Sequence, residues 1–130
     1  MTILYADDDH DDRELMSEAL QKVDPSISCL TANDGQNVLD ILNESSDLPD
    51  YIFLDVNMPV MDGKKCLVAL KKDQRLRDIP VVIYSTTTDN TEIKQLYNLG
   101  ASSFIQKPNN FSDLCSALNM FVRLVETSRQ

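Results

Sequence analysis

Five short apolar runs, separated by segments with helical periodicity, constrain the fold more than any other feature of the sequence. The runs cover residues 3–6, 27–30, 51–54, 81–84 and 103–105. Each has the length of a strand, and continuous apolar character is typical of strands that are buried on both faces. A helical segment follows each run, and this order predicts an α/β fold with a parallel sheet and helices on both of its faces.

The segments between the runs carry apolar residues at the spacing of one helix face. The five stripes are Leu15, Ala19 and Val23; Val38, Ile41 and Leu42; Cys66, Leu67 and Leu70; Ile93, Leu96 and Tyr97; and Phe111, Leu114, Leu118, Phe121, Val122 and Val125. Gly100 is well placed to end the fourth helix. Because parallel strands are joined by right-handed crossovers, few topologies remain for such a chain.

Length and charge narrow the class of protein. The 130 residues predict a single domain over residues 1–130, with residues 126–130 as a frayed tail, and 42% hydrophobic residues suffice for its core. A net charge of -9 argues against nucleic-acid binding, since phosphate backbones would be repelled. No segment is apolar enough to cross a membrane, and the first residues lack the basic start of a signal peptide. We therefore expect a soluble, cytoplasmic protein.

The three cysteines, Cys29, Cys66 and Cys115, are scattered and include no CxxC pair. Zinc sites need clustered ligands, so we interpret these residues as small, reduced, hydrophobic side chains rather than as a metal site or a redox pair.

Charged and hydroxyl side chains follow four of the five predicted strands. Asp7 and Asp8 follow the first, Asp55 the third, Ser85 the fourth and Lys107 the fifth. In an open α/β sheet the carboxyl ends of the strands share one edge, where ligands bind. The second strand delivers no comparable group, as expected of an outer strand.

The charges at this edge predict a divalent cation. Two carboxylates about 4 Å apart repel by about 4 kcal/mol at an effective dielectric near 20. Asp7, Asp8 and Asp55 bring three negative charges and Lys107 one positive charge, so a net charge of -2 remains. Oxygen ligands suit Mg²⁺ or Mn²⁺ better than zinc. With the cation bound, Asp55 can act as a nucleophile toward phosphorus, and Lys107 and Ser85 can bind the phosphoryl oxygens.

Over essentially its whole length the chain resembles the receiver domains of bacterial two-component response regulators. The matching segments are residues 3–8, 54–63, 79–85, 100–101 and 104–108. The resemblance implies a doubly wound, five-stranded, flavodoxin-like (βα)5 fold with strand order 2-1-3-4-5.

The resemblance also implies a role for each matching residue. Asp55 is the phosphoacceptor, and the Mg²⁺ (or Mn²⁺) ligands are Asp8, Asp55 and the backbone carbonyl of Asn57, with Asp7 acting through water. Lys107 pairs with the phosphoryl group, and its bond to Pro108 is expected to be cis.

Two further positions are implied to form a switch. Ser85 is the switch hydroxyl, and Phe104 is the aromatic residue whose rotamer follows it. Ser85 stands where the family often has threonine, and Thr86 stands where it often has a small residue, so the phosphoryl lifetime stays open. Phe104 could instead be an ordinary core residue, and Lys107 an ordinary surface lysine.

The resemblance implies partners as well. A sensor histidine kinase or a histidine phosphotransfer protein would donate the phosphoryl group, and the chain would catalyse its own modification rather than turn over a substrate. A downstream protein would bind the face of the fourth helix, fifth strand and fifth helix, and dimerisation through the same helices is left open.

Other readings of the same residues compete with this one. Asp7, Asp9, Asp11 and Glu18 match four positions of an EF-hand loop, but the turn glycine is absent. His10 could carry a phosphoryl group or bind a metal, although a lone histidine in a polar turn is more often a solvated surface residue.

Two rival functions also remain. A phosphatase of the haloacid dehalogenase type would need an acid two residues after its nucleophile, and Asn57 cannot serve as one. A protein-interaction module could instead keep the fold and act independently of phosphorylation.

Overall fold

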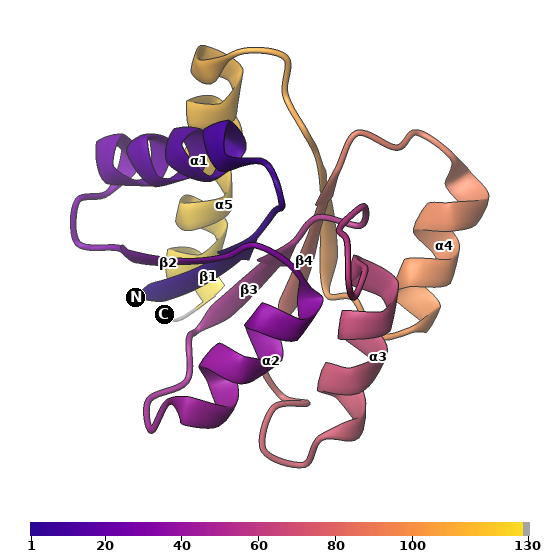
Figure 1. Cartoon of the computed structure of the whole chain (residues 1–130). Helices are drawn as coiled ribbons and strands as arrows, with labels where there is room; N and C mark the ends of the chain where they lie inside the picture. The colour runs from indigo at the N-terminus through magenta and orange to yellow at the C-terminus, as the bar shows by residue number, and fades with distance from the viewer. Residues whose placement is uncertain (129–130) are drawn as a thin grey trace.

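In a computed structural model, which describes residues 1–128, five strands alternate with five helices (Figure 1). The strands are β1 (Thr2–Ala6), β2 (Ser28–Ala32), β3 (Tyr51–Leu54), β4 (Val81–Ser85) and β5 (Ser103–Gln106). The helices are α1 (His10–Val23), α2 (Gly35–Glu44), α3 (Gly63–Lys72), α4 (Asn90–Asn98) and α5 (Phe111–Ser128). The predicted alternation is confirmed.

All neighbouring strands are parallel, and their order in the sheet is β2-β1-β3-β4-β5. Hydrogen bonds continue just past the strands: the amide of Asp7 donates to Ala32, and the amide of Asp55 donates to Ala6, both at 3.0 Å. The amide of Lys107 donates to the Ser85 carbonyl at 2.8 Å. The ladder therefore fixes the backbone of these residues at one edge of the sheet.

Successive residues of each central strand point into two different cores. One core lies under α1 and α5 and includes Tyr5, Phe53 and Tyr84. The other lies under α2, α3 and α4 and includes Leu54 and Ile83. Figure 1 shows α1 and α5 on one side of the sheet and the other three helices on the opposite side. Because both faces are covered, β1, β3 and β4 have the continuous apolar character that identified them as strands.

The outer strands differ from the expectation that all strands are buried on both faces. β2 and β5 each have a single neighbour in the sheet, and Leu30 of β2 is 44% exposed. In β5 the residues are half-buried or exposed. An edge position removes one layer of neighbours, and this explains the difference.

Three of the predicted helix stripes, those of α2, α3 and α5, lie on the faces that contact the sheet. The predicted stripe of α1 is partly wrong. Leu15 is 41% exposed, and the buried residues are Met16, Ala19 and Leu20. A repeat of four residues drifts by about 40° per step around a helix of 3.6 residues per turn, so it leaves the buried face within two turns.

The end of α4 agrees with the prediction for Gly100. This residue has a φ of 115°, and its amide donates to Tyr97 at 3.0 Å while the amide of Ala101 donates to Leu96 at 3.1 Å. These two bonds form a Schellman motif, which requires the left-handed backbone that glycine adopts without strain. Elsewhere the stripe of α4 is only partly buried: Leu96 lies in the core, whereas Tyr97 is 45% exposed.

Two expectations from the sequence are corrected. Residues 126–128 are the last residues of α5 rather than a frayed tail, because Val122 and Val125 hold this end of the helix against the protein, and residues 129–130 lie outside the described residues. The bond between Lys107 and Pro108 is trans, since the described chain holds no cis peptide bond, and trans is the intrinsically favoured isomer.

The three cysteines are free thiols, with Cys66 buried and the other two half-buried. Among the helices of residues 1–128, none has the length and apolar character that a membrane span requires.

Candidate functional site

Asp7 lies directly after β1 and is 1% exposed. Its Oδ2 accepts hydrogen bonds from the Tyr5 hydroxyl and from Lys107 Nζ, the latter at 2.8 Å, and its Oδ1 accepts the amide of Asp9 at 3.0 Å. Burial raises the pKa of the Asp7 carboxyl, but the bonds from Lys107, Tyr5 and Asp9 outweigh it and hold the pKa below its usual range. Asp7 is therefore ionised in the folded protein at neutral pH.

Asp55 lies directly after β3 and is 6% exposed. Lys107 Nζ lies 3.3 Å from its Oδ2, and the amide of Asn57 donates to its Oδ1 at 3.4 Å. Burial raises the pKa of Asp55 and Asp7 adds to the effect, whereas Lys107 opposes it; the net change is upward. The Asp55 carboxylate is therefore less well stabilised than that of Asp7.

The β3–α3 connection holds Asp55 by close backbone contact. The amide of Gly63, the first residue of α3, donates to the Val56 carbonyl at 2.9 Å. A Cβ atom at Gly63 would lie 2.4 Å from the Asp55 carbonyl oxygen, so no larger residue fits without moving the backbone of Asp55.

Lys107, directly after β5, is the cationic centre of the site. Its Nζ contacts carboxylates of Asp7 at 2.8 Å, Asp12 at 3.2 Å and Asp55 at 3.3 Å, and it lies 5.5 Å from the centroid of the Tyr84 ring. Burial alone would lower the pKa of Lys107, but the carboxylates raise it above its ordinary value. The sequence predicted that Asp7 and Asp55 lie near this lysine, whereas the contact with Asp12 was not predicted.

Asp7, Asp8 and Asp55 each place one carboxylate oxygen in a group whose members lie within 4.8 Å of one another. Asp8 is exposed, whereas the other two are buried. Three hard oxygen donors that open to solvent on one side fit a Mg²⁺ or Mn²⁺ ion that keeps part of its water shell. These residues would hold the ion; the role of the Asn57 carbonyl stays a prediction.

Ser85 and Phe104 occupy neighbouring strands near this edge. Ser85 is 1% exposed, and its Oγ accepts the amide of Thr87 at 3.2 Å. The Thr87 hydroxyl in turn donates to Glu92 of α4 at 3.1 Å. Phe104 pairs in register with Ile83 of β4 and is half-buried against the core beneath α2, α3 and α4. A chain of contacts thus runs from Ser85 to α4.

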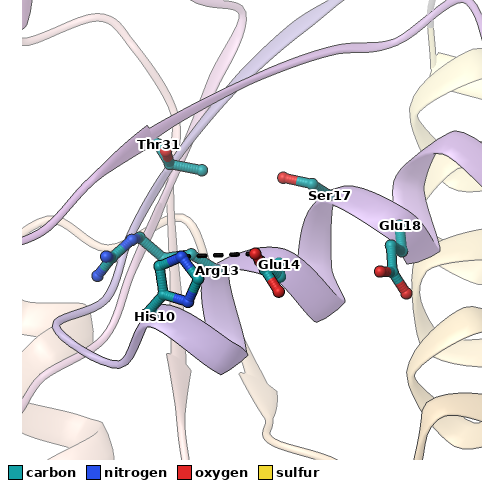
Figure 2. Close-up of a pocket in the computed structure, with 6 residues that line it drawn as sticks. All are labelled: His10, Arg13, Glu14, Ser17, Glu18 and Thr31. Carbon is teal, nitrogen blue, oxygen red and sulfur yellow. Dashed lines mark ion pairs between the residues drawn. The ribbon is translucent and has the colours of Figure 1, made fainter.

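His10 lies outside the predicted phosphorylation site. Figure 2 shows His10 at the start of α1, with a dashed line to Glu14. Its Nε2 lies 3.4 Å from Glu14 Oε1, and both residues line a pocket of about 500 Å³ together with Arg13, Ser17, Glu18 and Thr31. The His10 side chain is 69% exposed, in agreement with a solvated residue. Since α1 begins at His10, Asp11 and Glu18 of the proposed EF-hand loop lie in a helix, and the structure does not support that reading.

The sequence matches the family described as the response regulator receiver domain over residues 3–119. It is 30% identical over 116 residues to the probable methanogenesis regulatory protein FilR2 of Methanothrix harundinacea, and the match covers 86% of this chain and 75% of that protein.

Solved structures are similar in fold. The phosphorylated cyanobacterial phytochrome response regulator RcpA has a TM-score of 0.84 and 30% identity, with 92% of this chain and 89% of that chain covered. The Mn²⁺-bound form of response regulator Rcp1 has a TM-score of 0.80 and 27% identity, with 91% and 88% covered.

Proposed function

Because the chain belongs to the response regulator receiver domain family, we propose that Asp55 accepts a phosphoryl group in two-component signal transduction. One observation carries this proposal: the Lys107 ammonium bridges Asp7 and Asp55 beside the carboxylate trio of Asp7, Asp8 and Asp55. The proposed nucleophile, the proposed phosphate-binding cation and the carboxylates that would hold a divalent ion thus lie at one edge of the sheet.

The transfer step needs little from the protein beyond position and charge. An Asp55 oxygen attacks phosphorus while the bond from phosphorus to the donor breaks; with acetyl phosphate, acetate leaves and an aspartyl phosphate remains. A bound Mg²⁺ or Mn²⁺ ion would withdraw charge from the phosphoryl oxygens. Lys107 would pair with one of these oxygens, and the Ser85 hydroxyl would donate to another.

The proposed donor in the cell is a sensor histidine kinase or a histidine phosphotransfer protein. Phosphorylation adds about -1.5 to -2 charge beside Lys107 and Ser85. We expect Ser85 to move toward the phosphoryl group and Phe104 to change rotamer with it. Nuclear magnetic resonance signals of the Phe104 ring that stay unchanged on phosphorylation would contradict this role.

The output surface proposed here is formed by α4, β5 and α5. An apolar pocket of about 330 Å³ lies along β5 and α5, with Phe104 and Met120 in its wall, and Met120 is 66% exposed. In α4, Tyr97 is exposed at the surface, and Leu96 is the residue buried in the core. A helix with few buried side chains moves at low energetic cost. These features support binding of a downstream protein or of a second copy of the chain.

Intact mass after incubation with acetyl phosphate tests the phosphorylation proposal. We expect one phosphoryl addition to the wild type with Mg²⁺, and none with a chelator or in Asp55→Ala. Circular dichroism of Asp55→Ala shows whether that variant is folded. Failure of the folded wild type to gain mass with Mg²⁺ would contradict the proposal and favour a phosphorylation-independent interaction module.

We also propose that the chain acts only on its own phosphoryl group. The residue two positions after Asp55 is Asn57. Its amide is not acidic, so it cannot protonate a leaving group as the general acid of a phosphatase does. Sustained release of phosphate from p-nitrophenyl phosphate, lost in Asp55→Ala, would contradict this part of the proposal.

A further inference from the structure

All three N–H donors of the Lys107 ammonium face carboxylates in this protein. A lysine ammonium has three donors and no acceptor. The three carboxylates within 3.3 Å of Nζ belong to Asp7, Asp12 and Asp55, so a phosphoryl oxygen arriving at Asp55 has to displace one of them.

Asp12 is the partner that is easiest to displace. Its side chain is 40% exposed, whereas those of Asp7 and Asp55 are 1% and 9% exposed. Asp7 also accepts hydrogen bonds from Tyr5 and Asp9, and Asp55 is the proposed acceptor itself. Asp12 is neither the proposed nucleophile nor a member of the carboxylate trio.

The start of α1 holds Asp12 in its place. The amides of Asp11 and Asp12 donate to Asp9 Oδ1 at 2.8 and 3.1 Å, and Arg13 Nη1 donates to the Asp7 carbonyl at 2.7 Å. These bonds join the first turn of the helix to the loop after β1. Asp12 and Lys107 also line one pocket of about 160 Å³ together with Tyr84, so the carboxylate meets the ammonium in a partly enclosed space.

We propose that Asp12 is a positioning residue that competes with the incoming phosphoryl group for the Lys107 ammonium and thereby slows phosphorylation of Asp55. This inference rests on the proposed function. Lys107 stabilises the charge that develops on the phosphoryl oxygens, and an anion that holds the same ammonium reduces this stabilisation.

The test is the rate of phosphorylation by acetyl phosphate at saturating Mg²⁺, followed by intact mass. We expect Asp12→Asn to be phosphorylated about two- to fivefold faster than the wild type, the range expected for a partly exposed ion pair. Asp12→Glu, which keeps the carboxylate, is expected to have nearly the wild-type rate.

Asp11→Asn is the matched control for overall charge. Asp11 lies in the same turn, and its amide shares the same acceptor on Asp9, but its side chain is 91% exposed and contacts His10 rather than Lys107. We expect the wild-type rate for this variant. In a Lys107→Gln background, Asp12→Asn is expected to bring no increase, because the residue over which the two anions compete is gone.

Three results would overturn the role of Asp12 alone: no increase in Asp12→Asn, an equal increase in Asp11→Asn, or an increase that persists without Lys107. Circular dichroism and unfolding midpoints show whether each variant is folded. If the folded wild type took no phosphoryl group at all, both the proposed function and this inference would be overturned.

Discussion

At Asp55, burial and Lys107 act on the pKa of one carboxyl group in opposite directions, and burial prevails. The folded protein therefore holds the proton of Asp55 to a higher pH than the unfolded chain does. This residue's contribution to the free energy of unfolding consequently falls as the pH rises above the ordinary value of 3.8. Asp7 has the opposite effect on the pH dependence of stability, because folding lowers its pKa. Its contribution to the free energy of unfolding is lost as the pH falls through that lowered pKa.

Replacing Asp55 tests this charge balance. In a chelator at neutral pH, we expect Asp55→Asn to raise the free energy of unfolding by on the order of 1 kcal/mol, because it removes a poorly stabilised buried charge. The gain should shrink toward zero well below pH 3.8, where Asp55 is protonated in both the folded and the unfolded state. Denaturant unfolding across this pH range measures it, with the exposed Asp47→Asn as control. A loss of stability at neutral pH would show that Lys107 outweighs burial.

The residues at the strand ends could be predicted from the sequence, whereas the contact of Asp12 with Lys107 could not. Asp7, Asp55 and Lys107 were predicted because each directly follows a strand, and the hydrogen bonds between neighbouring strands fix such positions. Asp11 and Asp12 look alike in the sequence, since both are acids at a helix start. The phase of α1 decides which of the two faces Lys107, and that phase depends on the packing of the helix against the sheet.

At the scale of elements, the turn between β3 and α3 carries backbone strain beside the site. Val60 has a φ of 64°, and the amide of Met61 donates to the Pro59 carbonyl at 2.6 Å, which makes Val60 the centre of a γ-turn. This conformation is costly for a β-branched residue. The Val60 side chain is 83% exposed and gains little from packing in return.

We expect Val60→Gly to raise the free energy of unfolding by about 0.5–1 kcal/mol, because glycine accepts a positive φ and its greater freedom in the unfolded chain offsets only part of the relief. Val60→Ala removes most of the side chain but keeps a Cβ atom, and it should change stability much less. Equilibrium unfolding in urea distinguishes the two variants. A destabilised Val60→Gly would mean that the side chain contributes more than its exposure indicates.

The burial of the central strands was predicted correctly and that of the outer strand β2 was not, for a physical reason. β1, β3 and β4 lie between two strands and under helices on both faces, so their sequences are continuously apolar. β2 lies at an edge, and three of its five residues, Leu30 among them, are exposed. The lack of a polar group after this strand indicated an outer position, but the exposure of Leu30 itself was not evident from the apolar run, because it depends on contacts between segments that are distant in the chain.

At the scale of the whole molecule, a bound divalent ion is expected to couple the site to folding. Asp7 and Asp8 follow β1 and Asp55 follows β3, so an ion held by this trio joins two segments of the chain. An ion that binds only the folded protein stabilises it by about 2.7 kcal/mol at 100 times its Kd. We expect the thermal midpoint of the wild type to rise with Mg²⁺ concentration.

Asp8→Asn should remove most of this Mg²⁺-dependent rise while leaving the midpoint in a chelator nearly unchanged, since Asp8 is exposed. Asp11→Asn, which neutralises a nearby acid outside the trio, should keep the rise. Differential scanning calorimetry with and without Mg²⁺ gives both values. An equal rise in Asp8→Asn would place the stabilising ion elsewhere.

The sequence by itself determined the alternation of strands and helices, the parallel sheet and the polar residues at the strand ends, because these follow from local periodicity and from where each strand stops. The resemblance to receiver domains supplied the strand order, which the structure confirms. The tertiary structure alone decided the buried face of α1, the exposure of the outer strands and the third carboxylate at Lys107. Each of these depends on how a helix or strand is oriented against distant segments, and local sequence does not encode that orientation.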